Sequence, residues 1–173
     1  MAEIKQIVPP EWCFKCDVCC RFPESTSFLA PYFTGQEIDA AVQSGAAEPD
    51  FLNKTGCKIT LMPYEEAYIC PSFDTTTTHC RIYKARPFDC VLYPFALMLD
   101  ETGEKVVLGL DTKCPYVREN TGTDYIRDAC MDIAYTIDSP PFADIISENL
   151  DLIGPFQDDV VPLIVLNNLS SRL

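Results

Sequence analysis

Apolar residues in the last third of the chain recur at helical spacing. Between Thr123 and Ile137 they stand every three or four positions, which predicts an amphipathic helix. A second helix is predicted to follow Ser139-Pro140-Pro141 and run through Leu150, because proline is tolerated in the first turn of a helix. The apolar face of the first helix consists of Ile126, Ala129, Cys130, Ile133 and Ile137.

Earlier in the chain, the run from Thr34 to Glu37 has the form of a capping box, Thr-x-x-Glu, which opens a helix. Ile38, Ala41 and Val42 then share one face, and Gly45 ends the helix. A shorter helix is expected after Arg86, because Pro87 suits a first helical turn. That helix would carry Cys90, Val91 and Leu92.

Short apolar or β-branched runs predict several strands. Two of them, residues 58–62 and 66–69, flank Pro63-Tyr64, and the polar run 75–78 is expected to be a loop. Residues 95–99 and 106–110 bracket Asp100-Glu101-Thr102-Gly103-Glu104, whose residue types permit a tight reversal and predict a hairpin. Residues 160–166 contain Pro162 and therefore read as an edge strand.

The net charge and composition of the chain limit the kinds of molecule that it is expected to bind. The chain of 173 residues has 13 basic and 26 acidic residues, so its formal net charge is -13. A polyanion such as nucleic acid is repelled, and a basic protein is the expected partner. No apolar run is long enough to cross a membrane and the first residues lack the layout of a secretory signal, so we expect a cytoplasmic protein without membrane contact.

Ten cysteines are the strongest chemical signal in the sequence. Four of them, Cys13, Cys16, Cys19 and Cys20, lie in one octet, CFKCDVCC, and Cys-x2-Cys turns present two sulfurs to one metal. In a reducing compartment dense cysteine indicates metal more than disulfides, although an even count of ten also fits five bridges. A second group of thiols comprises Cys70, Cys80, Cys90 and Cys114.

Sulfur ligands from these two segments fit either tetrahedral zinc or an iron–sulfur cluster such as 4Fe-4S. Adjacent side chains such as Cys19 and Cys20 usually diverge, so a single centre rarely uses both: they serve two centres, or one of them is a buried thiol or a group that contacts the metal ligands without binding the metal. Two features favour iron–sulfur. His79 is the single imidazole and is interpreted as a loop residue outside the site, and Cys70-Pro71 and Cys114-Pro115 resemble the Cys-Pro ending of ferredoxin motifs.

The other cysteines are interpreted as core residues, because a buried thiol behaves as a small apolar side chain. Cys130 shares the apolar helix face, and Cys57 lies outside either spacing pattern. Arg86 is the charged residue expected beside the cofactor, where a guanidinium would offset thiolate charge; the alternative is a surface salt bridge. Nearby aromatic residues, Tyr83, Tyr93 and Phe95, form either a dry wall around the metal or ordinary core.

Four blocks of sequence carry a resemblance: CFKCDVCCRF (residues 13–22), CPSF (70–73), CRIYKARPFDCVLYPF (80–95) and Cys114-Pro115. On these the chain resembles the CxxCxxCC, or YkgJ-type, cysteine-cluster family, a zinc- or iron-chelating domain. The resemblance implies a metal-binding set of Cys13, Cys16, Cys19, Cys20, Cys70, Cys80, Cys90 and Cys114. Flagellin lysine methylases, which are associated with an iron–sulfur cluster, are similar in this region. Asp17 departs from the glycine frequent in the family after the second cysteine.

We therefore expect a small, metal-centred α+β fold with a mainly helical C-terminal extension. Residues 1–120 would form the cysteine-cluster domain and residues 121–173 the extension packed on it. The leading functional hypothesis is an iron–sulfur cluster used for electron transfer or for support of a partner enzyme. The alternative is a structural zinc module for protein interaction. Enzymatic methyl transfer has little support, because no Gly-x-Gly-x-x-Gly sequence follows a strand.

Overall fold

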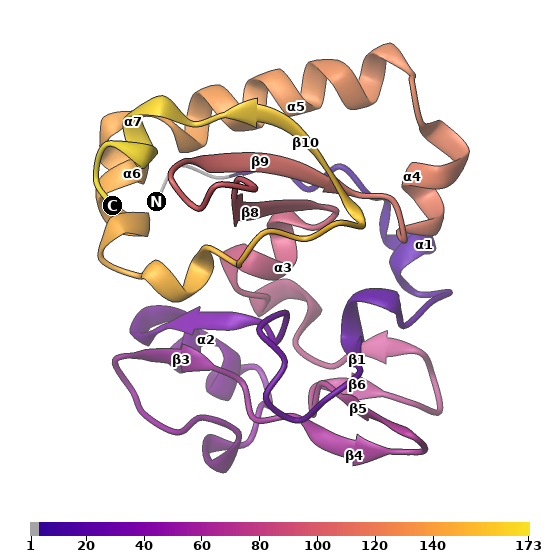
Figure 1. Ribbon diagram of the computed structural model, residues 1–173. Helices are drawn as coiled ribbons and strands as arrows, with labels where there is room; N and C mark the ends of the chain where they lie inside the picture. The colour runs from indigo at the N-terminus through magenta and orange to yellow at the C-terminus, as the bar shows by residue number, and fades with distance from the viewer. Residues whose placement is uncertain (1–3) are drawn as a thin grey trace. The chain divides into compact units, whose positions relative to one another are not determined.

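The structure, a computed structural model, describes residues 4–173, and the chain divides into two compact units (Figure 1). One unit is Pro9–Val91; the other is Leu92–Leu173 together with residues 4–8. Each unit combines helices with small antiparallel sheets, so the predicted α+β class is confirmed. The predicted domain boundary after residue 120 stays a prediction, because a compact unit is not by itself a domain that folds alone.

In the unit Pro9–Val91, every strand is only two or three residues long. One sheet has the order β1-β5-β4, while β2 pairs with β3 and β6 pairs with β7. Its elements are α1 (Pro10–Cys13), η1 (Val18–Cys20), β1 (Arg21–Phe22), β2 (Tyr32–Thr34), α2 (Gly35–Gln43), η2 (Glu48–Asp50), β3 (Gly56–Lys58), β4 (Met62–Tyr64), β5 (Ala67–Ile69), β6 (Phe73–Asp74), β7 (His79–Cys80), η3 (Tyr83–Ala85) and α3 (Phe88–Leu92), which runs one residue past the unit.

The predicted capping box at the start of α2 is confirmed. The Thr34 hydroxyl accepts a bond from the Glu37 amide at 3.4 Å, and Glu37 Oε2 accepts one from the Thr34 amide at 2.9 Å. Behind this helix, Phe33, Ile38 and Ile69 are at most 3% exposed and join one apolar core. Side-chain packing, with little strand pairing, therefore organises this unit.

The hairpin formed by β4 and β5 corrects the predicted strand bounds. Pro63 and Tyr64, expected to separate two strands, lie inside β4, and the reversal comes at Glu65, which has a φ of 54°. β4 is an edge of its sheet, where proline is tolerated because its missing N–H would point away from the neighbouring strand. The polar run 75–78 is the loop between β6 and β7, as predicted.

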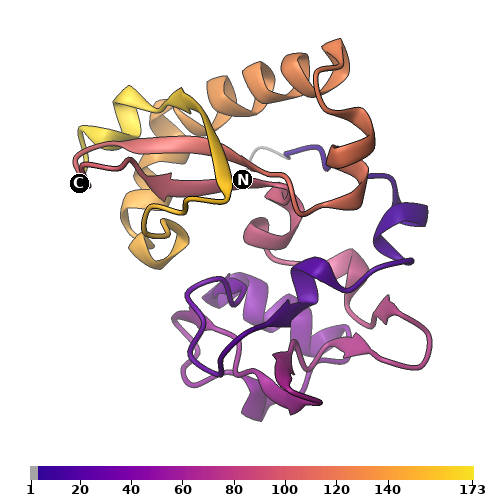
Figure 2. The same cartoon turned by 45° about the vertical axis from the view of Figure 1, so that its right-hand side comes forward.

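The second unit has longer elements. Its sheet has the order β10-β9-β8, and the helix α5 lies on one side of that sheet in both views (Figures 1 and 2). The elements are β8 (Phe95–Leu99), β9 (Val106–Asp111), α4 (Pro115–Asn120), α5 (Asp124–Ile137), α6 (Pro140–Ser147), η4 (Leu150–Leu152), β10 (Val160–Val165) and α7 (Asn167–Ser170). None of the helices within residues 4–173 combines the length and the apolar composition needed to cross a bilayer.

The sequence predicts most of this second unit correctly. Asp100 Oδ1 accepts bonds from the Glu104 and Lys105 amides in the turn between β8 and β9, and β10 is an edge strand that carries a bulge after Pro162. The α6 helix is shorter than predicted: it ends at Ser147. Asn149 then leaves helical geometry, with φ of -132° and ψ of 60°.

Candidate metal centre

Two single turns of helix position the first cysteines. Pro10 occupies the first position of α1, where its fixed φ suits a helix, and Cys13 is the last residue of that turn. The 3-10 turn η1 follows and contains both Cys19 and Cys20. Its amide at Cys20 donates to the Asp17 carbonyl at 2.8 Å.

A backbone hydrogen bond joins the octet to the second group of cysteines. After η1 the chain enters β1, which pairs with β5, and Cys70 directly follows β5. The Cys70 amide donates to the Cys20 carbonyl at 2.9 Å. Two cysteines fifty positions apart in sequence therefore lie side by side because of strand pairing.

Two further elements bring in Cys80 and Cys90. The β6–β7 ladder pairs Cys80 with Phe73, three residues beyond Cys70. Cys90 lies on α3, the short helix that was predicted to start with Pro87 and that begins at Phe88. The Phe88 amide donates to Glu37 Oε1 at 2.7 Å. Glu37 thus links the start of α2 to the helix that carries Cys90.

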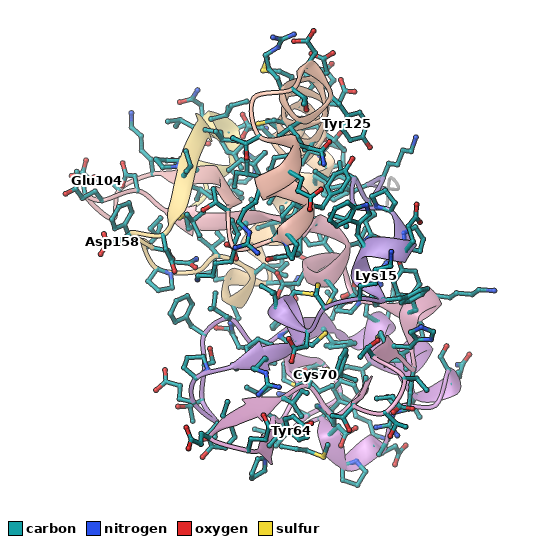
Figure 3. All side chains as sticks on the ribbon, turned by 90° about the vertical axis from the view of Figure 1, so that its right-hand side faces the viewer. Lys15, Tyr64, Cys70, Glu104, Tyr125 and Asp158 are labelled. Atoms are coloured by element: carbon teal, nitrogen blue, oxygen red, sulfur yellow. The ribbon has the colours of Figure 1, made fainter. Side chains whose placement is uncertain are left out.

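These segments surround a single cavity of about 50 Å³ within the unit Pro9–Val91. Phe14, Phe33 and Phe73 supply much of its apolar wall. Figure 3 shows Cys70, one of the lining residues, between the ribbons of this unit. The cysteines that line the cavity are Cys13, Cys19, Cys20, Cys70, Cys80 and Cys90.

Burial favours the neutral form of several thiols that line the cavity. Burial raises the pKa of the Cys70 thiol from 9.0 to about 12, and burial also raises the pKa of Cys90 well above its usual range. A hydrogen bond with Cys19, together with burial, raises the pKa of Cys20 well above that range. Since each neighbouring thiolate would raise these pKa values further, forming several thiolates here requires a compensating cation.

Arg86 lies on the wall of this cavity, where the sequence predicted a positive charge. Its guanidinium stacks over the Tyr83 ring at 3.7 Å and its Nε donates to the Tyr83 carbonyl at 2.9 Å. Burial raises the pKa of Cys80, while the Arg86 charge acts in the opposite direction. Arg86 therefore favours the Cys80 thiolate, although its role toward a cofactor stays a prediction.

The structure does not bring every predicted ligand to the cavity wall. Cys16 does not line the cavity, but its raised pKa, caused chiefly by burial, also reflects the nearby Cys19 and Cys13. Cys114, at the start of α4, belongs to the other unit, and its predicted ligand role is untested.

Cys57 and Cys130 are buried, as their interpretation as core residues predicts, whereas His79, interpreted as a loop residue, lies in the two-residue strand β7 and pairs with Asp74. Cys57 is buried in the apolar core, with its thiol near the Asn53 carbonyl at 3.6 Å. Cys130 is buried on the inner face of α5. The His79 ring packs against Phe14, with centroids 4.3 Å apart, and does not line the cavity.

The donor set fits a metal that prefers sulfur, since zinc and iron–sulfur clusters are held by thiolates. Residues 4–173 contain no disulfide that would consume these sulfurs. In the same residues, no three Cys, His, Asp or Glu side chains already stand in an arrangement that could hold a metal ion. A bound metal would therefore need the sulfurs to lie closer together than they do in this structure.

Sequence reasoning missed two residues at this site. One is Glu37, whose second carboxylate oxygen accepts from the Phe88 amide; the capping box gave no sign of that contact. The other is Ser72, which lines the cavity and whose buried hydroxyl has no hydrogen-bond partner among residues 4–173. Its place two residues after Cys70 was the only available signal.

Comparison with models of known protein families identifies a match. The family model CxxCxxCC, described as "Putative zinc- or iron-chelating domain", matches residues 12–131. No curated protein and no solved structure matches the chain. The matched region contains the whole octet, the cavity cysteines and Cys114, and it supports metal binding. The chain belongs to the CxxCxxCC family of zinc- or iron-chelating domains.

Proposed function

We propose that the unit Pro9–Val91 binds an iron–sulfur cluster and that the protein uses it to transfer electrons or to support a partner enzyme. The observation that carries this proposal is the convergence of six cysteine thiols, from four separate segments, on one cavity. Soft thiolate donors are the usual ligands of such clusters.

The composition of the cavity supports iron–sulfur over a mixed nitrogen and sulfur site. The single imidazole, His79, packs on Phe14 outside the lining, so the donors available at the cavity are sulfurs. Phe14, Phe33 and Phe73 line the cavity beside the cysteines, and solvent exposure is one of the factors that set a cluster's potential. A bound cluster supplies one-electron transfer.

Arg86 would balance charge in this proposal. A centre held by several thiolates is anionic overall, and Arg86 is held at the cavity by its contacts with Tyr83. The outside of the protein is also acidic, with a formal net charge of -13, which favours a basic protein partner and disfavours nucleic acid. Thiols kept reduced fit a cytoplasmic location.

A structural zinc site is the second candidate. It is favoured by the length of the strands in this unit, two or three residues each, because a bound metal can stabilise a fold with so little regular pairing. The cavity of about 50 Å³ has enough room for one zinc ion. In this case the function would lie on an interaction surface of the chain.

Anaerobic purification of the full chain separates the two candidates. An iron–sulfur protein would be brown, contain iron and sulfide, and give an electron paramagnetic resonance signal in one of its redox states. A colourless protein with stoichiometric zinc, even after growth with ample iron, would favour the structural role. A chain that takes up neither metal would contradict both.

A further inference from the structure

Ser72 presents an unused hydrogen-bond donor at the cysteine cavity. The residue is 3% exposed, and its hydroxyl oxygen is buried without a partner among residues 4–173. Buried hydroxyl groups are normally hydrogen-bonded, because leaving one unpaired costs desolvation free energy that nothing repays. The position of Ser72 therefore needs an explanation, and its place on the cavity wall points to what the cavity binds.

The backbone around Ser72 is fixed by other contacts. Its carbonyl accepts a bond from the Arg81 amide at 2.8 Å, across the β6–β7 hairpin. Its own amide bonds to the Cys70 sulfur. The Ser72 amide is therefore already paired with a sulfur of the cavity, while its hydroxyl has no partner among residues 4–173.

A second cavity touches the same residue. It has a volume of about 170 Å³ and is lined by Asp50, Met62 and Arg81 among others. Water in that cavity is the competing partner for the hydroxyl. Water and the metal centre can be told apart as partners of the Ser72 hydroxyl. A bond to water would exist with or without metal, whereas a bond to the metal centre would form only when metal binds.

We propose that the Ser72 hydroxyl donates a hydrogen bond to a sulfur of the bound metal centre, an inference that rests on the proposed function. A hydroxyl has one proton to donate, and thiolate or sulfide sulfur bound to metal is an acceptor. Such a bond withdraws charge from the sulfur, so it stabilises the metal–sulfur centre and favours the reduced state of a cluster. Ser72 is thus a positioning residue for the centre and not a ligand.

Cobalt(II) titration of the reduced, metal-free full chain tests this proposal, because its charge-transfer band reports the electron density on the thiolates. Ser72→Ala should weaken cobalt binding by about tenfold, the low end of effects seen when a partner of a metal ligand is removed. The sulfur-to-cobalt band should also shift, since the charge on the sulfur changes. Ser72→Thr keeps the hydroxyl and should restore much of both properties.

Ser27→Ala is the matched control. Ser27 is also 3% exposed and lies in the same unit, but its hydroxyl accepts from the Leu29 amide at 3.3 Å and does not line the cavity. This variant should bind cobalt with unchanged affinity and an unchanged band. Thermal unfolding of the metal-free chains completes the set: Ser72→Ala should lose no stability, because it removes an unpaired group.

Three results would overturn the inference. Equal cobalt affinity and an identical band in the wild-type chain and Ser72→Ala would show that the hydroxyl does not bond to the centre. Loss of stability in metal-free Ser72→Ala, with unchanged cobalt binding, would assign the hydroxyl to water or protein. Failure of the wild-type chain to bind cobalt would remove the proposed metal centre itself, and the inference with it.

Discussion

The two compact units of this chain use different means of stabilisation. In the unit Leu92–Leu173 the strands β8, β9 and β10 are five or six residues long, and α5 has fourteen residues with an apolar inner face. In the unit Pro9–Val91 the strands have two or three residues, and six thiols occupy the wall of one interior cavity. Regular structure and apolar packing account for the unit Leu92–Leu173, whereas the unit Pro9–Val91 also places six cysteines around one cavity.

This difference has an energetic meaning. A thiol packs as a small apolar group, but several thiols around one cavity fill it less well than branched side chains would. Metal binding would compensate for this weaker packing, because the free energy of binding adds to the free energy of folding. We therefore expect stability to depend on metal in the unit Pro9–Val91 and on side-chain packing in the other unit.

The largest effect is expected from Cys90→Ser. Cys90 lies on the cavity, so its loss should abolish stoichiometric metal and remove much of a binding free energy on the order of 10 kcal/mol. Elemental analysis and hydrogen exchange resolved by unit would measure the two consequences. Exchange should accelerate in Pro9–Val91 and change little in β8 and β9.

Cys130→Ser is the matched control for that variant. Cys130 is also buried, but it lies on α5 and does not line the cysteine cavity. Its replacement should leave the metal content intact. Loss of metal in Cys130→Ser, or full metal content in Cys90→Ser, would contradict the claim that the unit Pro9–Val91 binds the metal.

The pH dependence of metal binding should be the next largest effect. Burial raises the pKa of Cys70 to about 12 and the pKa of Cys90 well above 9.0, so both thiols are protonated at neutral pH and must release protons to bind metal. Affinity should therefore rise with pH and go on rising past pH 9, where an ordinary thiol would have finished titrating. Four thiolate ligands correspond to about 5 kcal/mol per pH unit.

Competition titrations with a chromophoric chelator at several pH values would measure this slope, and weakly buffered solutions would count the protons released. A flat profile between pH 6.5 and 8.5 would mean that the thiols are not the ligands. A slope that levels off near pH 9 would mean that the binding thiols are exposed, contrary to the burial of Cys70.

Leu108→Ala tests whether side-chain packing stabilises the unit Leu92–Leu173. Leu108 lies in β9, pairs in register with Leu97 and is 0% exposed, so truncation leaves a cavity and should cost about 2–5 kcal/mol. Chemical denaturation would measure the loss. The metal content should not change, and a variant that released metal would show that the stability of the two units is strongly coupled.

Thr34→Ala should have the smallest effect. The variant removes the N-cap of α2, where the Thr34 hydroxyl accepts from the Glu37 amide, and should cost about 1 kcal/mol. Because the free energy of metal binding adds to that of folding, the same loss should be measurable in both the metal-free and the loaded chain. Thermal unfolding with and without metal would measure both losses.

Local sequence signals predicted the elements that depend on neighbouring residues. The capping box at Thr34, the Asp100 turn and the helical period ending at Ile137 each depend on residues within a few positions, and each was found. Pro63 shows the limit, because its place inside β4 depends on which strand lies at the sheet edge.

The candidate site was predictable as a set of residue types but not as an arrangement. Spacing identified the octet, and the family resemblance supplied the more distant cysteines. The contact that joins Cys20 to Cys70 depends on pairing between β1 and β5, which no local pattern encodes. The same holds for Glu37, whose bond to the Phe88 amide depends on how α2 meets the start of α3.

X-ray absorption at the edge of the bound metal tests the central claim most directly. The anaerobically purified full chain should contain stoichiometric metal whose nearest neighbours are all sulfur, at about 2.3 Å for zinc. Iron neighbours in addition to sulfur would identify a cluster. A nearest shell of oxygen or nitrogen, or a metal whose spectrum is the same in Cys90→Ser, would contradict the claim that the cavity thiols hold it.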